Sequence, residues 1–155
     1  MLTGATLDGM TDTHEQDYAA TLNERRGALD VAMGIEYLEM RPGYGRARMP
    51  VEGNTQPFGM LHGGASVVLA ESLGSIVANL AAHPKVAFGT EVSATHHRPA
   101  TAGYVTATCT PLYEGRSTAT YQIDIHDENA RRICTARLSC ALRPRPDGLP
   151  DALAT

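Results

Sequence analysis

The sequence predicts an α+β fold in which a curved antiparallel sheet wraps one long central helix. The stretch from Gly63 to Ala82 is small and apolar, with a single ionisable side chain, and its larger residues recur at helical spacing. After this stretch the apolar period changes to two, which is typical of strands. The predicted helix is apolar on nearly all sides, as expected for a helix in the middle of a domain.

Length and composition predict one globular domain. The chain has 155 residues, of which 43% are apolar and 19% charged, and its net charge is −4. Because no basic tract is present, we expect neither nucleic acid nor a membrane surface as partner. We find no apolar run of membrane-spanning length and no signal-peptide pattern, so we expect a cytoplasmic protein. The domain is expected over residues 17–145, with flexible tails over residues 1–16 and 146–155.

A short helix and a strand pair are predicted before the central helix. Residues 17–28 can form the helix, and residues 33–40 and 44–49 are predicted as strands around the turn R-P-G-Y. The central helix is expected to end at His83, because Pro84 disfavours a helical conformation in the residue before it.

Four strands are predicted after the central helix. The last three follow one another through short turns, which predicts an antiparallel meander. Pro111 indicates a bulge or an edge position, because proline cannot donate a hydrogen bond to a neighbouring strand. The four strands are expected over residues 86–97, 104–113, 117–126 and 132–142.

Glu71 is the one ionisable residue of the central helix. Its neighbours three and four residues away are Val67, Val68, Gly74 and Ser75, and none is cationic. A buried carboxylate without a partner is costly, so it usually shifts its pKa or serves chemistry. Two interpretations stay open: Glu71 faces water on an amphipathic helix, or it is a functional carboxylate in a buried position.

The sequence His62-Gly63-Gly64 begins the central helix. Free backbone N–H groups at a helix N-terminus bind negatively charged oxygen, and the helix dipole adds to the attraction. A carbonyl placed there would be polarised as in an oxyanion hole. Alternatively, the two glycines only permit a tight turn into the helix.

Three other kinds of site are not expected. Residues 70–74 come close to the serine-hydrolase pattern but lie inside a helix, whereas that pattern needs a strand before the serine. His96 and His97 are adjacent on a strand and point to opposite faces, so we expect no metal site. The three cysteines lack metal-type spacing and are expected to be buried as small apolar residues.

Arginine and hydroxyl side chains gather at strand ends and turns. Arg98 follows one strand, Arg116 lies in a turn with Ser117 and Thr118, and Arg145 follows the last strand. Arginine binds phosphate through two parallel hydrogen bonds, so these residues could contact a phosphorylated ligand. Each of them alone is equally an ordinary solvated charge.

Four stretches together resemble the hotdog-fold acyl-CoA thioesterases. The resemblance covers roughly residues 33 to 145, and its closer match is the branch with a glutamate on the helix. That branch includes 1,4-dihydroxy-2-naphthoyl-CoA and 4-hydroxybenzoyl-CoA thioesterases and the enterobactin-pathway proofreading thioesterases. The stretches are Q-P-F-G-M-L-H-G-G-A-S-V-V-L-A-E-S-L-G-S, G-T-E-V-S-A-T-H-H-R-P, Y-E-G-R-S-T-A-T-Y-Q-I-D-I and C-T-A-R-L-S-C-A-L.

The resemblance implies roles for particular residues. Glu71 would be the nucleophile or general base, and the Gly63 N–H would polarise the thioester carbonyl. Gln56 and His62 would position the carbonyl or the water, and Ser75 would hold the water or the acyl group. Thr95 stands where relatives often have Asn before the histidine, so the resemblance leaves the role of His96 open. The expected substrate and coenzyme A contacts are Phe58, His97, Arg98, Arg116, Ser117, Thr118 and Arg145.

The resemblance also implies the reaction and the assembly. We expect hydrolysis of an aromatic acyl-CoA to the free acid and coenzyme A, without a cofactor, since coenzyme A is part of the substrate. We expect a homodimer or homotetramer in which two subunits share each active site. The alternatives are a hotdog hydratase or dehydratase, and a non-catalytic acyl-CoA-binding protein on the same scaffold.

Overall fold

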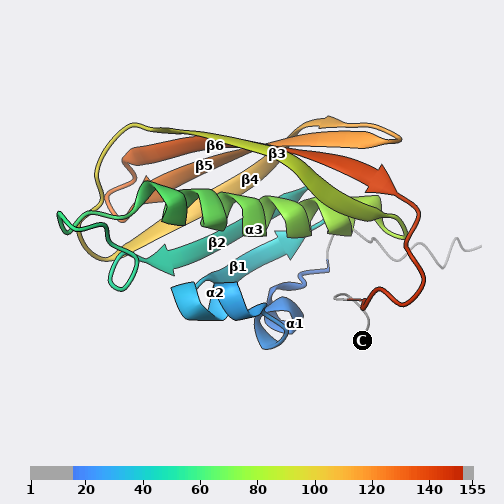
Figure 1. The fold of residues 1–155 in the computed structure, drawn as a ribbon, viewed down its shortest axis with the longest axis horizontal. Coiled ribbons are helices and arrows are strands. Elements are labelled where there is room, and N and C mark those ends of the chain that lie inside the picture. The colour runs from blue at the N-terminus through green and yellow to red at the C-terminus, as the bar shows by residue number, and fades with distance from the viewer. Residues whose placement is uncertain (1–15, 152–155) are drawn as a thin grey trace, which may run out of the picture.

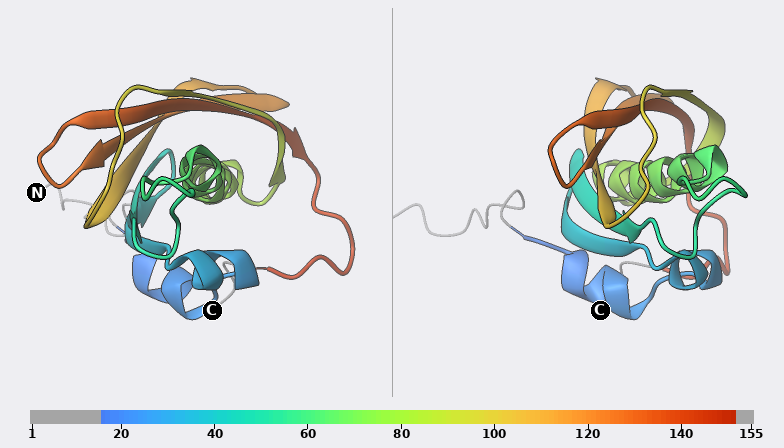
Figure 2. Two further views of the ribbon diagram at one scale, coloured as in Figure 1. Left: turned by 60° about the vertical axis from the view of Figure 1, so that its left-hand side comes forward. Right: turned by 90° about the vertical axis from the view of Figure 1, so that its left-hand side faces the viewer.

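The long helix α3 lies along the concave face of one curved antiparallel sheet (Figures 1 and 2). The computed structural model describes residues 16–151. Its six strands stand in the order β1-β2-β4-β5-β6-β3. This arrangement confirms the predicted fold. The elements are α1 (Ala19–Glu24), α2 (Ala28–Met33), β1 (Glu36–Arg41), β2 (Tyr44–Pro50), α3 (Gly63–Ala82), β3 (Val86–His96), β4 (Tyr104–Glu114), β5 (Thr118–Asp127) and β6 (Arg132–Arg143).

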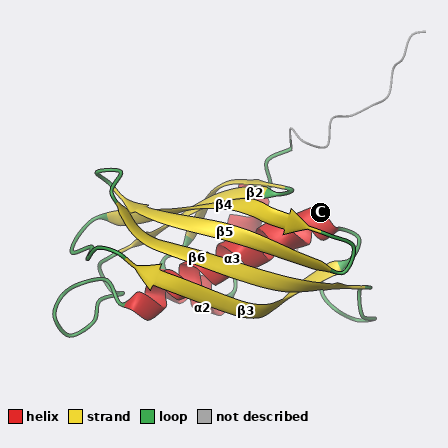
Figure 3. Cartoon of the chain, turned by 90° about the horizontal axis from the view of Figure 1, so that it is seen from above, coloured by secondary structure: helices red, strands yellow, loops and turns green. Residues whose placement is uncertain are grey.

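Most of the predicted boundaries agree with the structure. Helix α3 ends at Ala82, just before the expected residue, and strands β4, β5 and β6 form the predicted meander (Figure 3). The register of β4 against β5 shifts between Pro111 and Tyr113, which confirms the predicted bulge.

The segment before β1 differs from the prediction. Residues 28–33, whose last residue was expected to begin a strand, form the helix α2, and β1 begins only at Glu36. Gly34 ends α2 in a left-handed conformation with φ 69°, which glycine adopts without strain. The predicted helix over residues 17–28 is shorter than expected and covers only α1.

One face of α3 is packed tightly against the sheet. Leu69, Leu73 and Val77 are fully buried in a core shared with Ile123 and Leu138. Burial of each large apolar side chain contributes about 1.5–3 kcal/mol to folding. This face is therefore the main source of the helix's stability.

The other face of α3 is only partly covered within one chain. By length and composition alone, α3 could cross a membrane, contrary to the sequence-based expectation, but half of its most apolar window is buried inside this domain. Val68, Ser75 and Ile76 are half-buried and Glu71 is exposed. The expectation of a helix buried on all sides is therefore wrong for the single chain.

The two edges of the sheet differ. The edge of β1 is covered by polar groups that precede it: the Asn23 side chain accepts from Tyr37 N–H and donates to Tyr37 C=O, and Asp17 Oδ1 accepts from Met40 N–H. On the opposite edge, the backbone of Ala87 pairs with the Asn79 side chain. Beyond Ala87, the outer edge of β3 has no hydrogen-bond partner within residues 16–151.

All three cysteines are buried and free, as predicted. Burial raises the pKa of Cys134 and of Cys140 to about 11 and also raises that of Cys109. Within residues 16–151, no group of three or more His, Cys, Asp or Glu side chains is arranged to hold a metal ion.

The domain limits stay predictions. Residues 1–15 and 152–155 of the expected tails lie outside the described part of the chain. At the other limit, Arg145 donates to the carbonyl of Pro150 and pairs with Asp151 at 3.2 Å.

Gly45 lets β2 approach α3, and a side chain there should destabilise the fold. An added Cβ would lie 2.6 Å from Val77 Cγ2 and 2.9 Å from Leu73 Cδ1. We expect Gly45→Ala to lower the free energy of unfolding by about 1–3 kcal/mol in urea denaturation, because the core must shift to accept it. The matched control is Gly89→Ala on β3, where the nearest atom lies at 3.5 Å. Equal stability of the two variants would contradict this account of the helix–sheet contact.

Candidate active site

The N-terminus of α3 presents a free backbone donor. His62 is the N-cap residue, and its Nδ1 accepts the Gly64 N–H at 2.8 Å. The His62 carbonyl accepts from Ala65 N–H at 2.9 Å. The Gly63 N–H has no hydrogen-bond partner in the described chain. Gly63 therefore offers the donor that an oxyanion site needs.

Gly63 also has a packing reason to be glycine. An added Cβ would lie 2.9 Å from Nε2 of His96, so the His96 imidazole lies directly over this residue.

The His62 ring has one nitrogen left as a donor. Its Nδ1 accepts the Gly64 N–H, which places the proton of the neutral ring on Nε2. His62 thus caps the helix and still has a donor to offer.

Gln56 is held in the loop before α3 by its backbone and by its side chain. Its N–H donates to the Met60 carbonyl at 2.8 Å, and its carbonyl accepts from Gly59 N–H at 3.0 Å. Its Oε1 accepts the N–H of Phe58. The Nε2 group is then the donor left for a ligand.

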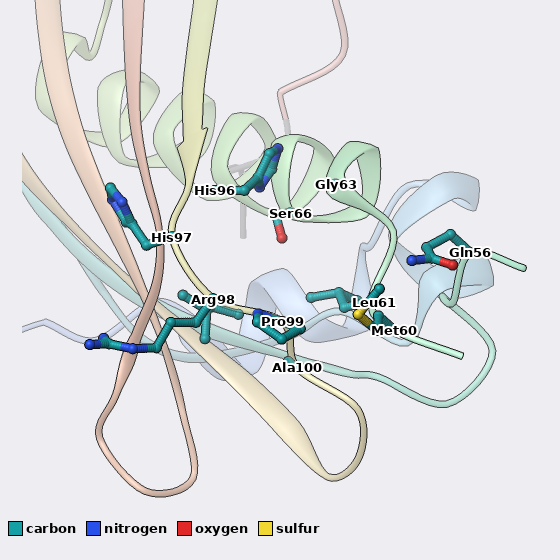
Figure 4. Close-up of a pocket in the computed structure, with 11 residues that line it drawn as sticks. Gln56, Met60, Leu61, Gly63, Ser66, His96, His97, Arg98, Pro99 and Ala100 are labelled. Carbon is teal, nitrogen blue, oxygen red and sulfur yellow. The ribbon is translucent and has the colours of Figure 1, made fainter. Parts of the chain in front are cut away.

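A cavity of about 420 Å³ lies between this loop, the start of α3 and the segment after β3 (Figure 4). The two histidines at the end of β3 point in different directions, as predicted: His96 lies over Gly63, whereas His97 lies 3.1 Å from Thr135 Oγ1 (Figure 4). The residues that line the cavity include Gln56, Gly63, Ser66, His96, Arg98 and Pro99.

Glu71 lies on the incompletely covered face of α3. Its carboxylate makes no hydrogen bond or ion pair with any described residue. It lies over Gly89 of β3, where an added Cβ would be 3.5 Å from Glu71 Oε1 and 4.0 Å from Ser75 Oγ. The structure therefore brings Glu71 and Ser75 together, as the sequence predicts.

The donor residues and the carboxylate do not meet within one chain. Gly63 and Glu71 are eight residues apart on α3, which is about 12 Å along the axis and about 80° around it. Each chain thus holds a donor half-site (Gln56 and Gly63) and a carboxylate half-site (Glu71 and Ser75). Neither half-site alone can polarise a carbonyl and attack it.

Sequence reasoning missed a buried polar cluster beside Glu71. Asp30 is 8% exposed and accepts from Tyr37 Oη at 2.7 Å and from Ser72 Oγ at 2.8 Å. Burial, and then the hydrogen bond to Asp30, raises the pKa of Tyr37. The cluster fastens α2 and β1 to α3 one residue after Glu71. Because Asp30 and Ser72 lie 42 residues apart, no local pattern indicates their contact.

The expected coenzyme A contacts fall into two groups at opposite ends of α3, about 30 Å apart. Arg98 lies near the helix N-terminus and donates to the Arg132 carbonyl. Arg116 lies near the helix C-terminus, where its carbonyl accepts from Lys85. Ser117, Thr118 and Arg145 lie at this second end. The Phe58 ring is exposed (87% for the residue), and only its backbone N–H is bonded to the donor half-site, through Gln56.

Comparison with known proteins identifies the family. The model of the thioesterase superfamily matches residues 58–134. The proofreading thioesterase EntH of Klebsiella pneumoniae is 46% identical over 112 residues, which cover 71% of this chain and 82% of that protein. The chain belongs to the thioesterase superfamily. It is a thioesterase with the hotdog fold, and these relatives give no support to a hydratase or to a non-catalytic binding protein.

Solved structures agree with this thioesterase in fold. A thioesterase from Haemophilus influenzae has a TM-score of 0.81 at 34% identity, covering 88% of this chain and 98% of that one. A Staphylococcus aureus protein solved with a Glu→Ala substitution has a TM-score of 0.71 at 34% identity, covering 76% and 99%. The same protein, named a thioesterase, was also solved with a Gln→Ala substitution. Its two substituted positions are fifteen residues apart, as Gln56 and Glu71 are.

The cap made by His62 predicts a stability effect that is separate from catalysis. We expect His62→Ala to lower the free energy of unfolding by about 1 kcal/mol, because the Gly64 N–H loses its acceptor. His62→Asn restores a capping acceptor and should unfold near the wild-type urea concentration. If both variants lose the same stability, the imidazole does not act as the cap.

Proposed function

We propose that this thioesterase hydrolyses an aromatic acyl-CoA, such as a hydroxybenzoyl-CoA or 1,4-dihydroxy-2-naphthoyl-CoA, at a site shared by two copies of the chain. The observation that carries the proposal is the separation of two unpartnered groups, the Gly63 N–H and the Glu71 carboxylate. Each is suited to one half of thioester hydrolysis, and each lacks its counterpart nearby. A second copy can supply the missing half-site on each side.

The difference between the sheet edges favours pairing through β3. The β1 edge is covered by Asp17 and Asn23, whereas the outer edge of β3 beyond Ala87 is open. An open edge is a template for another strand. Phe88, on β3, is 42% exposed, and the partly covered face of α3 lies next to the same strand. A second copy joined here would extend the sheet and cover both surfaces.

Antiparallel pairing of β3 with its copy also accounts for the split basic groups. In such a dimer the two α3 helices run in opposite directions, so the Arg98 end of one chain lies beside the Arg116 end of the other. The two groups could then contact one coenzyme A molecule. A single chain leaves them about 30 Å apart.

Thioester hydrolysis needs only groups that the two half-sites supply. The Gly63 N–H of one chain polarises the thioester carbonyl, with Gln56 Nε2 as a second donor. Glu71 of the other chain attacks the acyl carbon or takes a proton from the water that does so. The carbon–sulfur bond breaks, coenzyme A leaves as its thiolate, and the oxygen of water ends in the free acid. Ser75 lies beside Glu71 and is suited to hold the water.

The aromatic preference rests on the helix glutamate motif and on the cavity. The cavity of about 420 Å³ lies at the lower end of the range for small-molecule sites, which suits a flat acyl group better than a long chain. Met60, Leu61 and Pro99 supply apolar walls, and Gln56 and Ser66 supply polar groups.

Replacement of Glu71 tests the catalytic half of the proposal. We expect Glu71→Ala and Glu71→Gln to lower kcat by at least ~10²-fold, because a positioned base or nucleophile is lost. Release of free coenzyme A can be followed with a thiol reagent, since the protein's three thiols are buried. The matched control is Glu128→Gln at an exposed turn, with normal turnover expected. Normal turnover in folded Glu71→Gln protein would rule out this role.

The acyl preference is tested by comparing kcat/KM for benzoyl-, hydroxybenzoyl-, 1,4-dihydroxy-2-naphthoyl- and palmitoyl-CoA. We expect the aromatic thioesters to be hydrolysed at least ~10-fold more efficiently than palmitoyl-CoA, since a long chain exceeds the cavity. A preference for palmitoyl-CoA would overturn the substrate assignment and leave the thioesterase assignment standing.

A further inference from the structure

The Ser66 hydroxyl lies on the wall of the cavity beside Gly63. Ser66 is in the first turn of α3, and the residue is only 3% exposed. Its Oγ points into the cavity, away from the helix (Figure 4). The Ser66 backbone N–H donates to the His62 carbonyl at 3.4 Å, but no hydrogen bond of the Oγ is found among residues 16–151.

The Ser66 residue is almost fully enclosed, but its Oγ is still accessible from the cavity. A hydroxyl in this position is open to a hydrogen bond with water or with a ligand. The other serines of α3 lie differently: Ser72 donates to Asp30, and Ser75 lies beside Glu71. Ser66 alone among them faces the cavity at the helix N-terminus.

The walls around Ser66 Oγ are mainly apolar. Leu61 and Ala100 come from the segments on either side of the cavity, and Ile133 comes from β6. The charged Arg98 points its guanidinium away, toward the Arg132 carbonyl (Figure 4). This environment suits the ring of an acyl group rather than a phosphate.

We propose that Ser66 determines acyl specificity by hydrogen bonding a hydroxyl group on the ring of the substrate. The proposal rests on the proposed aromatic acyl-CoA hydrolysis. Ser66 lies three residues beyond Gly63, about 4.5 Å farther along the axis and on a neighbouring part of the helix surface. A carbonyl bound at Gly63 N–H therefore leaves the attached ring within reach of Ser66. A site built to bind a hydroxyl rejects the analogue that lacks it.

The test compares substrates with and without the hydroxyl. The kcat/KM of wild-type protein is measured for benzoyl-CoA and for its 2-, 3- and 4-hydroxy derivatives. We expect at least one hydroxylated thioester to be preferred by about tenfold, as one hydrogen bond supplies. In Ser66→Ala this preference should fall close to one, because the loss of kcat/KM is larger for the hydroxylated thioester than for benzoyl-CoA. Ser66→Cys keeps the side-chain shape, with a somewhat larger atom that is only a weak donor, and should also lose the preference.

Inert thioether analogues separate this inference from the proposed reaction. The dissociation constants of phenacyl-CoA and of its preferred hydroxy derivative are measured by calorimetry, which needs no turnover. If wild-type protein prefers the hydroxy analogue in binding and Ser66→Ala removes that preference, the Ser66 site is supported. Failure to hydrolyse any aromatic thioester would then overturn only the proposed function. Ser139→Ala on the outer face of the sheet is the matched control and should keep the preference.

Two outcomes would overturn the inference. One is a Ser66→Ala protein whose kcat/KM falls by the same factor for benzoyl-CoA and for its hydroxy derivatives. This result would place Ser66 at the thioester or in a structural role. The other is a wild-type protein that shows no preference among benzoyl-CoA and its three hydroxy derivatives in kcat/KM, and none between the two phenacyl-CoA analogues in binding.

Discussion

The packing of one face of α3 in the concave sheet determines the rest of the structure. Leu69, Leu73 and Val77 point into the core, and Gly45 on β2 lets the two elements come close. This contact fixes the rotation of the helix. Glu71 is consequently held on the face that one chain leaves exposed, while the free Gly63 N–H is held at the helix end. The separation of the two half-sites is thus a consequence of how the core is packed.

The sheet was predictable because its signals are local. The apolar alternation marks the strands, Pro111 marks the bulge and Pro84 marks the end of α3. Helix α2 was not predictable in the same way. Its six residues lack a clear period, and the contacts of Asp30 with Tyr37 and Ser72 that hold it form only in the folded chain.

The candidate site was predictable where a residue is unusual for its surroundings. Glu71 is the one charge of an apolar helix, and Gly63 lies in a glycine pair at a helix start. Ser66 has no such signal, because a serine among small helical residues is common and only its position on the cavity wall distinguishes it. His96 was likewise missed, since its contact with Gly63 depends on how β3 crosses the helix end.

In the proposed dimer, each active site takes one half-site from each of two chains. Mixing the variants Gln56→Ala and Glu71→Ala, each expected to be inactive alone, under subunit exchange tests this arrangement. Half of the dimers would then be mixed, each with one intact site, so about a quarter of the wild-type activity should return. The double variant Gln56→Ala/Glu71→Ala, mixed with either single variant, cannot rebuild a site and is the control. Subunit exchange is verified with mass-tagged subunits. If exchanged mixtures recover no activity, or if a monomer is fully active, the active site is not shared between two chains.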